Sequence, residues 1–385
     1  MRFDLVFAGG GLSACLTALR IADARPDLSL VVVETQDALA GDHFWSFHDA
    51  DVPPGRLAWL RPLVAHHWDA QRVVFPGRER VLATGYNSVT AERLREAVAA
   101  LPNVTVLTGT PAARVDPDGV TLADQTRLSG TVLDARGASP SPHLTLGFQK
   151  FLGQHVRTVT PHGVTIPTIM DATVPQTDGY RFVYVLPLSA DVLHVEDTYY
   201  ADGDDLPKQA LRAEIASYCE RQGWDVAEVI REEDGVLPIV LEGDVDAYFV
   251  DLRGQPAPIG MRAVAFNPIT GYSLPVAAEL ADRLVDLLRT RDPDPGALFS
   301  EVEAFSKAAW RSHAFYRLLN RMMFRAAPPQ DRWIILRRHY GLSRPLIERF
   351  YAGRSTLADK ARILAGKPPV PLHRAVAAMR PQGRD

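Results

Sequence analysis

The segment Asp4-Leu5-Val6-Phe7-Ala8-Gly9-Gly10-Gly11-Leu12-Ser13-Ala14 decides the fold of this chain, because an apolar run enters a glycine turn and then a helix. Residues 5–8 predict a strand buried on both faces, and residues 13–24 predict an apolar helix without Gly or Pro. A tight turn at Gly9, close backbone approach at Gly11 and a small side chain at Ala14 suit a pyrophosphate at a helix N-terminus. The predicted dinucleotide-binding loop comprises Gly9, Gly10, Gly11, Leu12 and Ala14.

A second apolar run strengthens this prediction. Residues 30–33 form a short strand pattern that ends in Glu34, at the distance where an acidic residue binds an adenosine ribose. A glutamate at this position fits FAD or NAD and argues against NADP. The alternative is a βαβ unit whose glycines serve packing alone.

Length and composition indicate an ordinary folded protein of two domains. The chain has 385 residues, of which 46% are hydrophobic and 23% are charged. Cys15 and Cys219 are the two cysteines, so we expect no disulfide framework and a reducing, cytoplasmic compartment. The first strand begins directly at the N-terminus and no apolar run matches a bilayer span, so we expect a soluble or peripheral protein.

Charge is distributed unevenly along the chain. Residues 305–385 contain 17 Lys plus Arg against 4 Asp plus Glu, although the whole chain carries a net charge of −4. A basic C-terminal segment on an acidic body suggests an anionic partner, either nucleic acid or a membrane surface. The alternative is a helical region with ordinary solvated basic faces.

Turn signals and apolar runs divide the chain into four parts. We expect a nucleotide-binding part at 1–146 that includes a small meander, a strand-rich part at 147–249, a return to the nucleotide-binding part at 250–290, and a basic helical region at 291–385. The fold class is thus α/β, with a Rossmann-like domain and a β-rich substrate domain.

The strand-rich part contains the clearest hairpin, formed by residues 180–188 and 192–200. Alternation along the second strand puts Asp197 on one face and Glu196 on the other, with His194 beside Glu196. The two adjacent carboxylates therefore cannot enter one pocket. Spacing alone favours a solvated strand face for Glu196.

Three further segments carry weaker signals. Thr270, Gly271 and Tyr272 form a turn before a helix at 276–289 and offer a second site for phosphate or flavin contacts. The aromatic segment 41–48 either lines a cofactor pocket or is a loop packed on the core, and its histidines lack the ligand spacing of a metal site, so we predict none. Residues 303–325 read as a basic amphipathic helix that lies in a membrane interface or packs on the body.

Together these motifs resemble one family, the bacterial-type lycopene β-cyclases. The resemblance rests on the glycine loop, HFWSFHDAD, VLDARG, MDATVPQTDGYRFVYVLPL, HVEDTYY, NPITGYSLP and RPLIERFYAGRSTLADKARILAGKPPVP, and spans nearly the whole chain. Two departures stand out: Asn267 and Ile269 replace an expected His and Thr, and Gly260-Met261 replaces a Gly-Asp pair that many related flavoproteins place on the ribityl chain.

The resemblance implies a fold like those of flavin monooxygenases and geranylgeranyl reductases, with FAD bound non-covalently and lycopene as substrate. Closing a β-ionone ring is a non-redox isomerisation that an acid initiates, and an apolar pocket keeps such a carboxyl protonated. The acidic strand motif then makes Glu196 the general acid and Asp197 a supporting residue. Reduced FAD, kept reduced by NAD(P)H, and aromatic faces such as Phe182 or Tyr184 would stabilise the cation.

A bilayer substrate also decides between the partners of the basic C-terminal region. The resemblance favours docking on the inner face of the cytoplasmic membrane and gives no role to nucleic acid. The competing functions are an FAD-dependent oxidoreductase, either geranylgeranyl reductase-like or a monooxygenase, and a nonenzymatic carotenoid- or flavin-binding protein.

Overall fold

The computed structural model describes residues 1–366 and 370–379. Its first sheet has the order β8-β2-β1-β11-β10-β9, and a short strand β17 pairs with β11. Strands β8, β2, β1, β11 and β17 run parallel, whereas β9 and β10 continue antiparallel from β11 as the predicted meander. The bounds are β1 Arg2–Ala8, β2 Leu30–Val33, β8 Val104–Leu107, β9 Ala112–Asp116, β10 Gly119–Leu122, β11 Arg127–Asp134 and β17 Ala257–Pro258.

Alternation along β1 builds the core of this part. Leu5 and Phe7 face α1, α3 and α6, whereas Val6 and Ala8 face a separate apolar cluster with residues of the meander. Strand β1 therefore is buried on both faces, as its continuous apolar run predicts. The covering helices are α1 Leu12–Ala24, α3 Ala91–Ala99 and α6 Leu274–Leu288, and α2 Pro54–Leu60 and α5 Val245–Asp251 lie beside this part.

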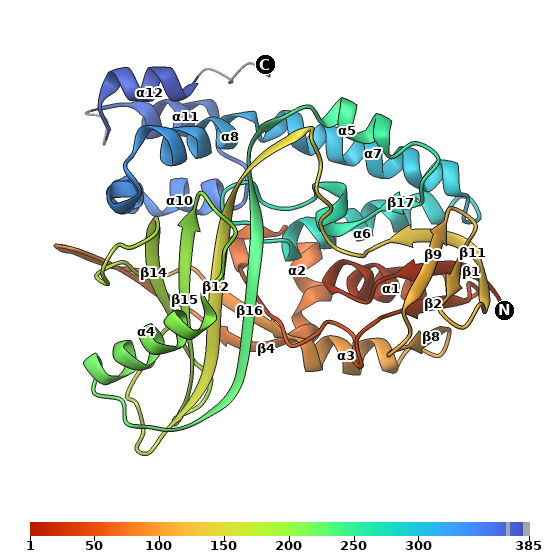
Figure 1. Cartoon of the computed structure of the whole chain (residues 1–385), viewed down its shortest axis with the longest axis horizontal. Helices are drawn as coiled ribbons and strands as arrows, with labels where there is room; N and C mark the ends of the chain where they lie inside the picture. The colour runs from red at the N-terminus through yellow and green to blue at the C-terminus, as the bar shows by residue number, and fades with distance from the viewer. Residues whose placement is uncertain (367–369, 380–385) are drawn as a thin grey trace.

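The second sheet is long and strongly curved, with the order β16-β12-β15-β14-β13-β5-β6 (Figure 1). The predicted hairpin forms β14 and β15, and helix α4 Lys208–Arg221 packs on one face of the sheet. Strands β5 and β6 come from within the predicted first part, residues 1–146, yet they pair in this sheet. The bounds are β5 Gln71–Phe75, β6 Arg78–Leu82, β12 Leu144–Thr158, β13 Thr168–Asp171, β14 Tyr180–Pro187, β15 Val192–Ala201 and β16 Val226–Gly243.

A third sheet has the strand order β3-β7-β4, and its first strand contacts both large apolar cores. Its first strand contains the aromatic segment that sequence reasoning treated as a loop or a pocket wall. Phe47 packs in the core of the nucleotide-binding part, whereas Phe44 packs against the second apolar core. The bounds are β3 Phe44–His48, β4 Val64–Trp68 and β7 Tyr86–Thr90.

The C-terminal helices cover the open face of the second sheet (Figure 1). The prediction of one continuous helix over 303–325 is wrong, because α7 ends at Ser312 and α8 begins at Ala314. The break leaves the Trp310 carbonyl free to accept a 2.6 Å hydrogen bond from Arg317, whose guanidinium lies over the Trp310 ring. The bounds are α7 Pro295–Ser312, α8 Ala314–Arg321, a π-helix Met322–Ala326, α9 Arg332–His339, α10 Arg344–Tyr351, α11 Leu357–Leu364 and α12 Leu372–Met379.

The basic side chains along α7, α8 and the π-helix mostly have partners on the body. Lys307 pairs with Glu303 and Asp246, and Arg325 pairs with Glu242. This segment therefore packs on the body, the second of the two sequence alternatives. Part of the predicted basic region, at 367–369 and 380–385, lies outside the described residues. The division into four parts stays a prediction.

Candidate active site

The glycine loop adopts the conformation that its sequence predicts. Gly9 has φ of 100°, and a Cβ there would lie 2.8 Å from the Ala135 carbonyl oxygen. A Cβ at Gly10 would lie 2.4 Å from Leu39, and Gly11 is the N-cap residue of α1. These glycines let β1, α1 and β11 meet closely, which leaves the α1 N-terminus open toward a cavity.

The Glu34 carboxylate faces this loop. It accepts hydrogen bonds from the backbone N–H of Gly10 at 2.7 Å and of Gln36 at 2.9 Å. Within the described residues, the buried hydroxyl of Ser13 has no hydrogen-bond partner although it lines the same cavity. An acidic group, a glycine-lined backbone and an unsatisfied hydroxyl at one helix N-terminus fit the ribose and phosphates of FAD.

The returning segment closes this cavity from the other side. Gly260 has φ of 64°, and a Cβ there would lie 2.9 Å from the Ser13 Cβ. Gly271, with φ of 68°, and Tyr272 also line the cavity, whereas Thr270 lines a neighbouring one and accepts a hydrogen bond from the Tyr272 N–H at 3.2 Å. The returning segment thus lies beside the glycine loop, as the predicted return to the nucleotide-binding part requires.

Asn267 stands where the family resemblance suggests a histidine, and it organises this turn. Its side-chain oxygen accepts hydrogen bonds from the N–H groups of Ile269 at 2.9 Å and Thr270 at 3.3 Å. Its amide donates to the Tyr351 carbonyl at 2.7 Å. The departure therefore preserves the turn, which connects to helix α10.

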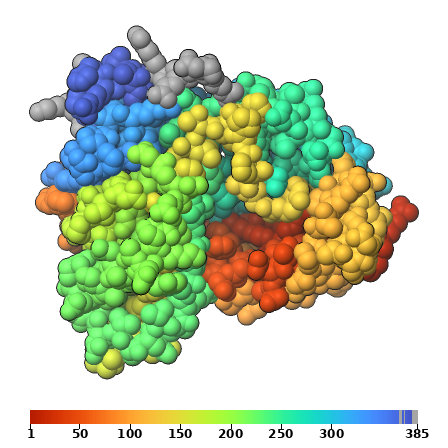
Figure 2. All heavy atoms as spheres, in the orientation of Figure 1, coloured from red at the N-terminus to blue at the C-terminus, as the bar shows by residue number. Residues whose placement is uncertain are grey.

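The cavity has a volume of about 320 Å³ and lies where the glycine loop meets the second sheet. Figure 2 shows a recess on this face, between the red N-terminal segment and the green strands. Aromatic side chains line much of the cavity, together with the carboxyls of Glu196 and Glu233. The aromatic lining residues are Phe44, Trp45, Tyr86, Phe151, Tyr184 and Tyr272.

The Glu196 side chain points into this cavity and not to bulk solvent. The strand face for which the sequence alternation favoured solvent exposure forms the wall of the cavity. The side chain of Glu196 is 14% exposed. The Thr198 hydroxyl donates to Glu196 Oε1 at 2.7 Å, and His194 Nε2 lies 3.4 Å from Glu196 Oε2. Tyr184 is directly opposite Glu196 on β14. The Glu196 carboxyl is therefore held from two sides beneath an aromatic wall.

Asp197 lies on the opposite face of β15, as the alternation predicts. It is fully buried and accepts hydrogen bonds from Arg181 at 2.9 and 3.0 Å and from the Tyr199 hydroxyl at 3.1 Å. This ion pair belongs to the layer under α4. Asp197 does not line the Glu196 cavity.

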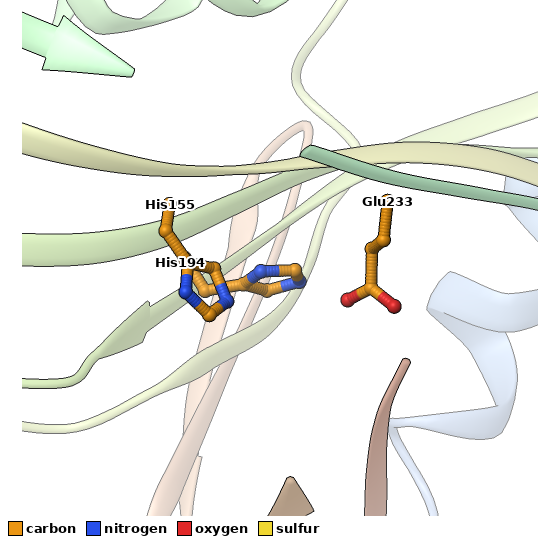
Figure 3. Close-up of side chains that lie close together, drawn as sticks. All are labelled: His155, His194 and Glu233. Carbon is orange, nitrogen blue, oxygen red and sulfur yellow. The ribbon is translucent and has the colours of Figure 1, made fainter. Parts of the chain in front are cut away.

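Two residues with functional chemistry escaped sequence reasoning, namely His155 and Glu233. Their side chains lie together with His194 (Figure 3), and ligand atoms of the three residues lie within 4.8 Å of one another. Glu233 accepts a 3.0 Å hydrogen bond from the Phe44 N–H. Burial lowers the pKa of His155 to about 3, so its imidazole is neutral at pH 7. The set has donor types that suit a divalent cation, and the prediction of no metal stays a prediction.

Strand register explains how Glu196 and Glu233 share one wall. Gly153 on β12 pairs with Glu196 on β15 and with Glu233 on β16. A Cβ at Gly153 would lie 2.6 Å from His194 Cε1. The missing side chain therefore leaves the space that the His194 ring occupies between the two carboxyls.

A family model described as lycopene cyclase protein matches residues 4–377. The chain belongs to the lycopene cyclase family. It is 47% identical over 373 residues to a lycopene beta-cyclase of Pseudescherichia vulneris, covering 97% of this chain and 96% of that protein. It is 41% identical over 383 residues to a lycopene beta-cyclase of Pantoea ananas, covering 98% of each. The resemblance seen in the sequence motifs is thus confirmed, and with it membership of a family of cyclases.

Solved structures show where the fold of this lycopene cyclase family member belongs. A geranylgeranyl bacteriochlorophyll reductase-like protein from Thermoplasma acidophilum superposes with a TM-score of 0.62 at 13% identity, over 96% of this chain and 97% of that one. A probable FAD-dependent monooxygenase from Pseudomonas aeruginosa gives 0.56 at 17% identity, over 86% and 98%. The predicted fold class is confirmed.

Proposed function

We propose that this member of the family is a lycopene β-cyclase, which closes β-ionone rings on the acyclic ends of lycopene to give γ-carotene and then β-carotene. The reaction is a non-redox isomerisation. The observation that carries the proposal is the position of the Glu196 carboxyl, fixed by Thr198 and His194 in an aromatic-walled cavity that adjoins the glycine loop. An acid in such a cavity meets an apolar double bond with little competing water.

The chemistry needs one acid and one base. The Glu196 carboxyl gives its proton to the terminal double bond, and the neighbouring double bond attacks the resulting tertiary cation to close the ring. Loss of a ring proton then restores neutrality, and we assign this proton to the carboxylate that the first step leaves on Glu196. Atoms balance without any oxidant or reductant, and the acid is regenerated.

Aromatic faces along the cavity wall would lower the energy of the cation without trapping it. Tyr184 lines the cavity directly opposite Glu196, whereas Phe182, the other residue suggested by sequence, packs in the second apolar core. Tyr184, Phe44 and Trp45 therefore take this role in the proposal. Asp197 supports the strand that carries Glu196.

Gly9, Gly10, Gly11, Leu12, Ala14 and Glu34 would hold FAD at the α1 N-terminus, with Thr270, Gly271 and Tyr272 at its flavin end. Reduced FAD would supply negative charge beside the cation, and NAD(P)H would serve solely to keep the flavin reduced. Chemically reduced FAD, supplied anaerobically without nicotinamide, should then support cyclisation. Absence of cyclised product under these conditions would contradict the non-redox mechanism.

Two other function classes predict different outcomes in the same experiment. A geranylgeranyl reductase-like enzyme or a monooxygenase would consume NAD(P)H in proportion to product. A nonenzymatic pigment-binding protein would return lycopene unchanged. Chromatography of the extracted carotenoids, together with nicotinamide absorbance, separates all three.

We further propose that the protein docks on the inner face of the cytoplasmic membrane through its C-terminal helices. No helix among the described residues is long and apolar enough to span a bilayer. Support comes from exposed apolar side chains on α11 and α12, at Leu357, Leu364, Val376 and Met379, near the exposed cations Arg362 and Arg374. Flotation with anionic liposomes should fall in Leu357→Asp/Val376→Asp, and unchanged flotation would remove this surface.

A further inference from the structure

Three neighbouring cavities share their walls. The Glu196 cavity adjoins a second cavity of about 30 Å³, and a third of about 120 Å³ lies between helices α8, α9, α10 and α11. Tyr184 and Tyr272 line both the first and the second cavity. Ile269, Met323 and Leu336 line both the second and the third. The three cavities are therefore arranged in a row, and each neighbouring pair shares two or three lining residues.

The third cavity, here called the helix cavity, leads outward. Leu364 of α11 lines it and is 44% exposed, so this wall reaches the molecular surface. Burial lowers the pKa of His339 to about 4, so the imidazole that contributes to the lining is neutral at pH 7. The remaining lining is mostly aliphatic, with Leu319, Met322, Ile335, Leu342, Ile363 and Val370, and it also includes Asn320 and Arg338.

The middle cavity, here called the tyrosine cavity, is the narrow point. Six tyrosines line it, namely Tyr180, Tyr184, Tyr200, Tyr272, Tyr340 and Tyr351. The hydroxyls of Tyr184 and Tyr272 form a 2.7 Å hydrogen bond at the border with the Glu196 cavity. Its volume of about 30 Å³ is the smallest of the three cavities, so a ligand passes here only if tyrosine side chains rotate.

The Glu196 cavity alone is too small to hold the whole substrate. Its volume of about 320 Å³ is at the lower end of the range for drug-sized ligands, roughly 300–1,000 Å³. A C40 chain whose end group reaches Glu196 must therefore extend beyond this cavity. The row through the tyrosine and helix cavities offers an apolar and aromatic path toward α11, where the exposed apolar residues lie.

We propose that the three cavities are one channel, through which an acyclic polyene threads end-first from the bilayer at α11 to Glu196, and that the Tyr184–Tyr272 pair is its gate. This inference rests on the proposed function, because that function supplies the polyene ligand. The chemistry of recognition is apolar and aromatic contact along a conjugated hydrocarbon, with the gate hydroxyls exchanging partners as the chain passes.

A substitution at the junction of the second and third cavities tests the channel. Leu336→Trp adds bulk there, and Leu206→Trp is its control, a half-buried leucine before α4 that lines none of these cavities. Lycopene binding is measured in detergent by the visible circular dichroism that a chiral site induces in the polyene, in a Glu196→Gln background without turnover. Conversion of lycopene to cyclised product is measured by chromatography in proteins that retain Glu196. We expect binding and conversion to fall at least about tenfold in Leu336→Trp and to stay within about twofold in Leu206→Trp.

A second variant keeps the channel testable if Leu336→Trp does not fold. Leu364→Trp narrows the mouth at a position that the fold exposes, so we expect it to fold and to convert lycopene about threefold more slowly. Binding and conversion at the parent level in both variants would overturn the channel. If the parent protein binds the polyene without cyclising it, the proposed function fails. The channel is then still tested by the difference in lycopene binding between the parent and the variants. If the parent does not bind the polyene, both fail.

Discussion

His194 Nε2 lies 3.4 Å from Glu196 Oε2, and the imidazole occupies a space that exists because residue 153 is glycine. The ring stacks on Phe44 and lies edge-on to His155, which fixes its plane. Thr198 holds the other carboxyl oxygen. The orientation of the proposed acid thus depends on the absence of a side chain at residue 153 of the neighbouring strand β12.

Gly153→Ala should therefore impair cyclisation without removing any polar atom. The new Cβ would lie 2.6 Å from His194 Cε1, so the ring must shift from the position in which it approaches Glu196. A displacement of this order near reacting groups costs up to about 10²-fold in rate. The measurement is the turnover rate with lycopene at equal FAD content. Gly203→Ala is the control, because no described heavy atom beyond the adjacent residues lies within 4 Å of a Cβ there, and equal rates in the two variants would refute the dependence.

Glu196→Gln and Asp197→Asn should separate chemistry from stability. Glu196→Gln removes the proposed acid and should lower turnover by at least about 10²-fold, with an unchanged flavin spectrum.

Asp197→Asn leaves the buried Arg181 guanidinium with Glu214 as its remaining carboxylate, so the free energy of unfolding should fall by about 3 kcal/mol. Its turnover per folded molecule should stay near the parent value. Denaturant titration and single-turnover assays check both, and an active Glu196→Gln would move the acid elsewhere.

Glu34→Gln should weaken FAD binding. The substitution keeps the side-chain shape but replaces a charged acceptor, and the difference between charged and neutral hydrogen bonds is worth about 1 kcal/mol, or roughly fivefold to tenfold in Kd. Flavin fluorescence titration of the apoprotein measures the change. Glu220→Gln, exposed on α4, is the matched control. Equal affinity in both variants would show that Glu34 does not contact the cofactor.

Sequence predicted what depends on local pattern. The glycine loop, the position of Glu34, and the separation of Glu196 from Asp197 follow from spacing within one strand or one turn. The register between distant strands does not follow from local spacing. The sequence therefore gave no indication that Gly153, Glu233 and His155 adjoin Glu196. Strands β5 and β6 likewise join the second sheet through pairing with β13, nearly a hundred residues later.

The break between α7 and α8 shows a different limit. Apolar periodicity continues across Ser312 and Ala314, and so predicts one helix. Tertiary contacts accompany the break: Asn320 donates to the carbonyls of Val240 and Pro268, and Arg321 donates to the carbonyl of Leu241. Such contacts with β16 and the returning segment are absent from any local window.

Acid should destabilise the protein between about pH 6.5 and 4 in part through His339. Burial lowers the pKa of its imidazole from 6.5 to about 4. Between these pH values the imidazole is protonated in the unfolded chain but stays neutral in the folded protein. The free energy of unfolding therefore falls as pH falls, by up to about 1.4 kcal/mol per pH unit for such a group. His339→Leu removes this proton uptake, and its stability should fall less between pH 6.5 and 5 than that of the parent. Urea titrations at both pH values measure the difference, and the same loss in parent and variant would show that His339 does not control acid sensitivity.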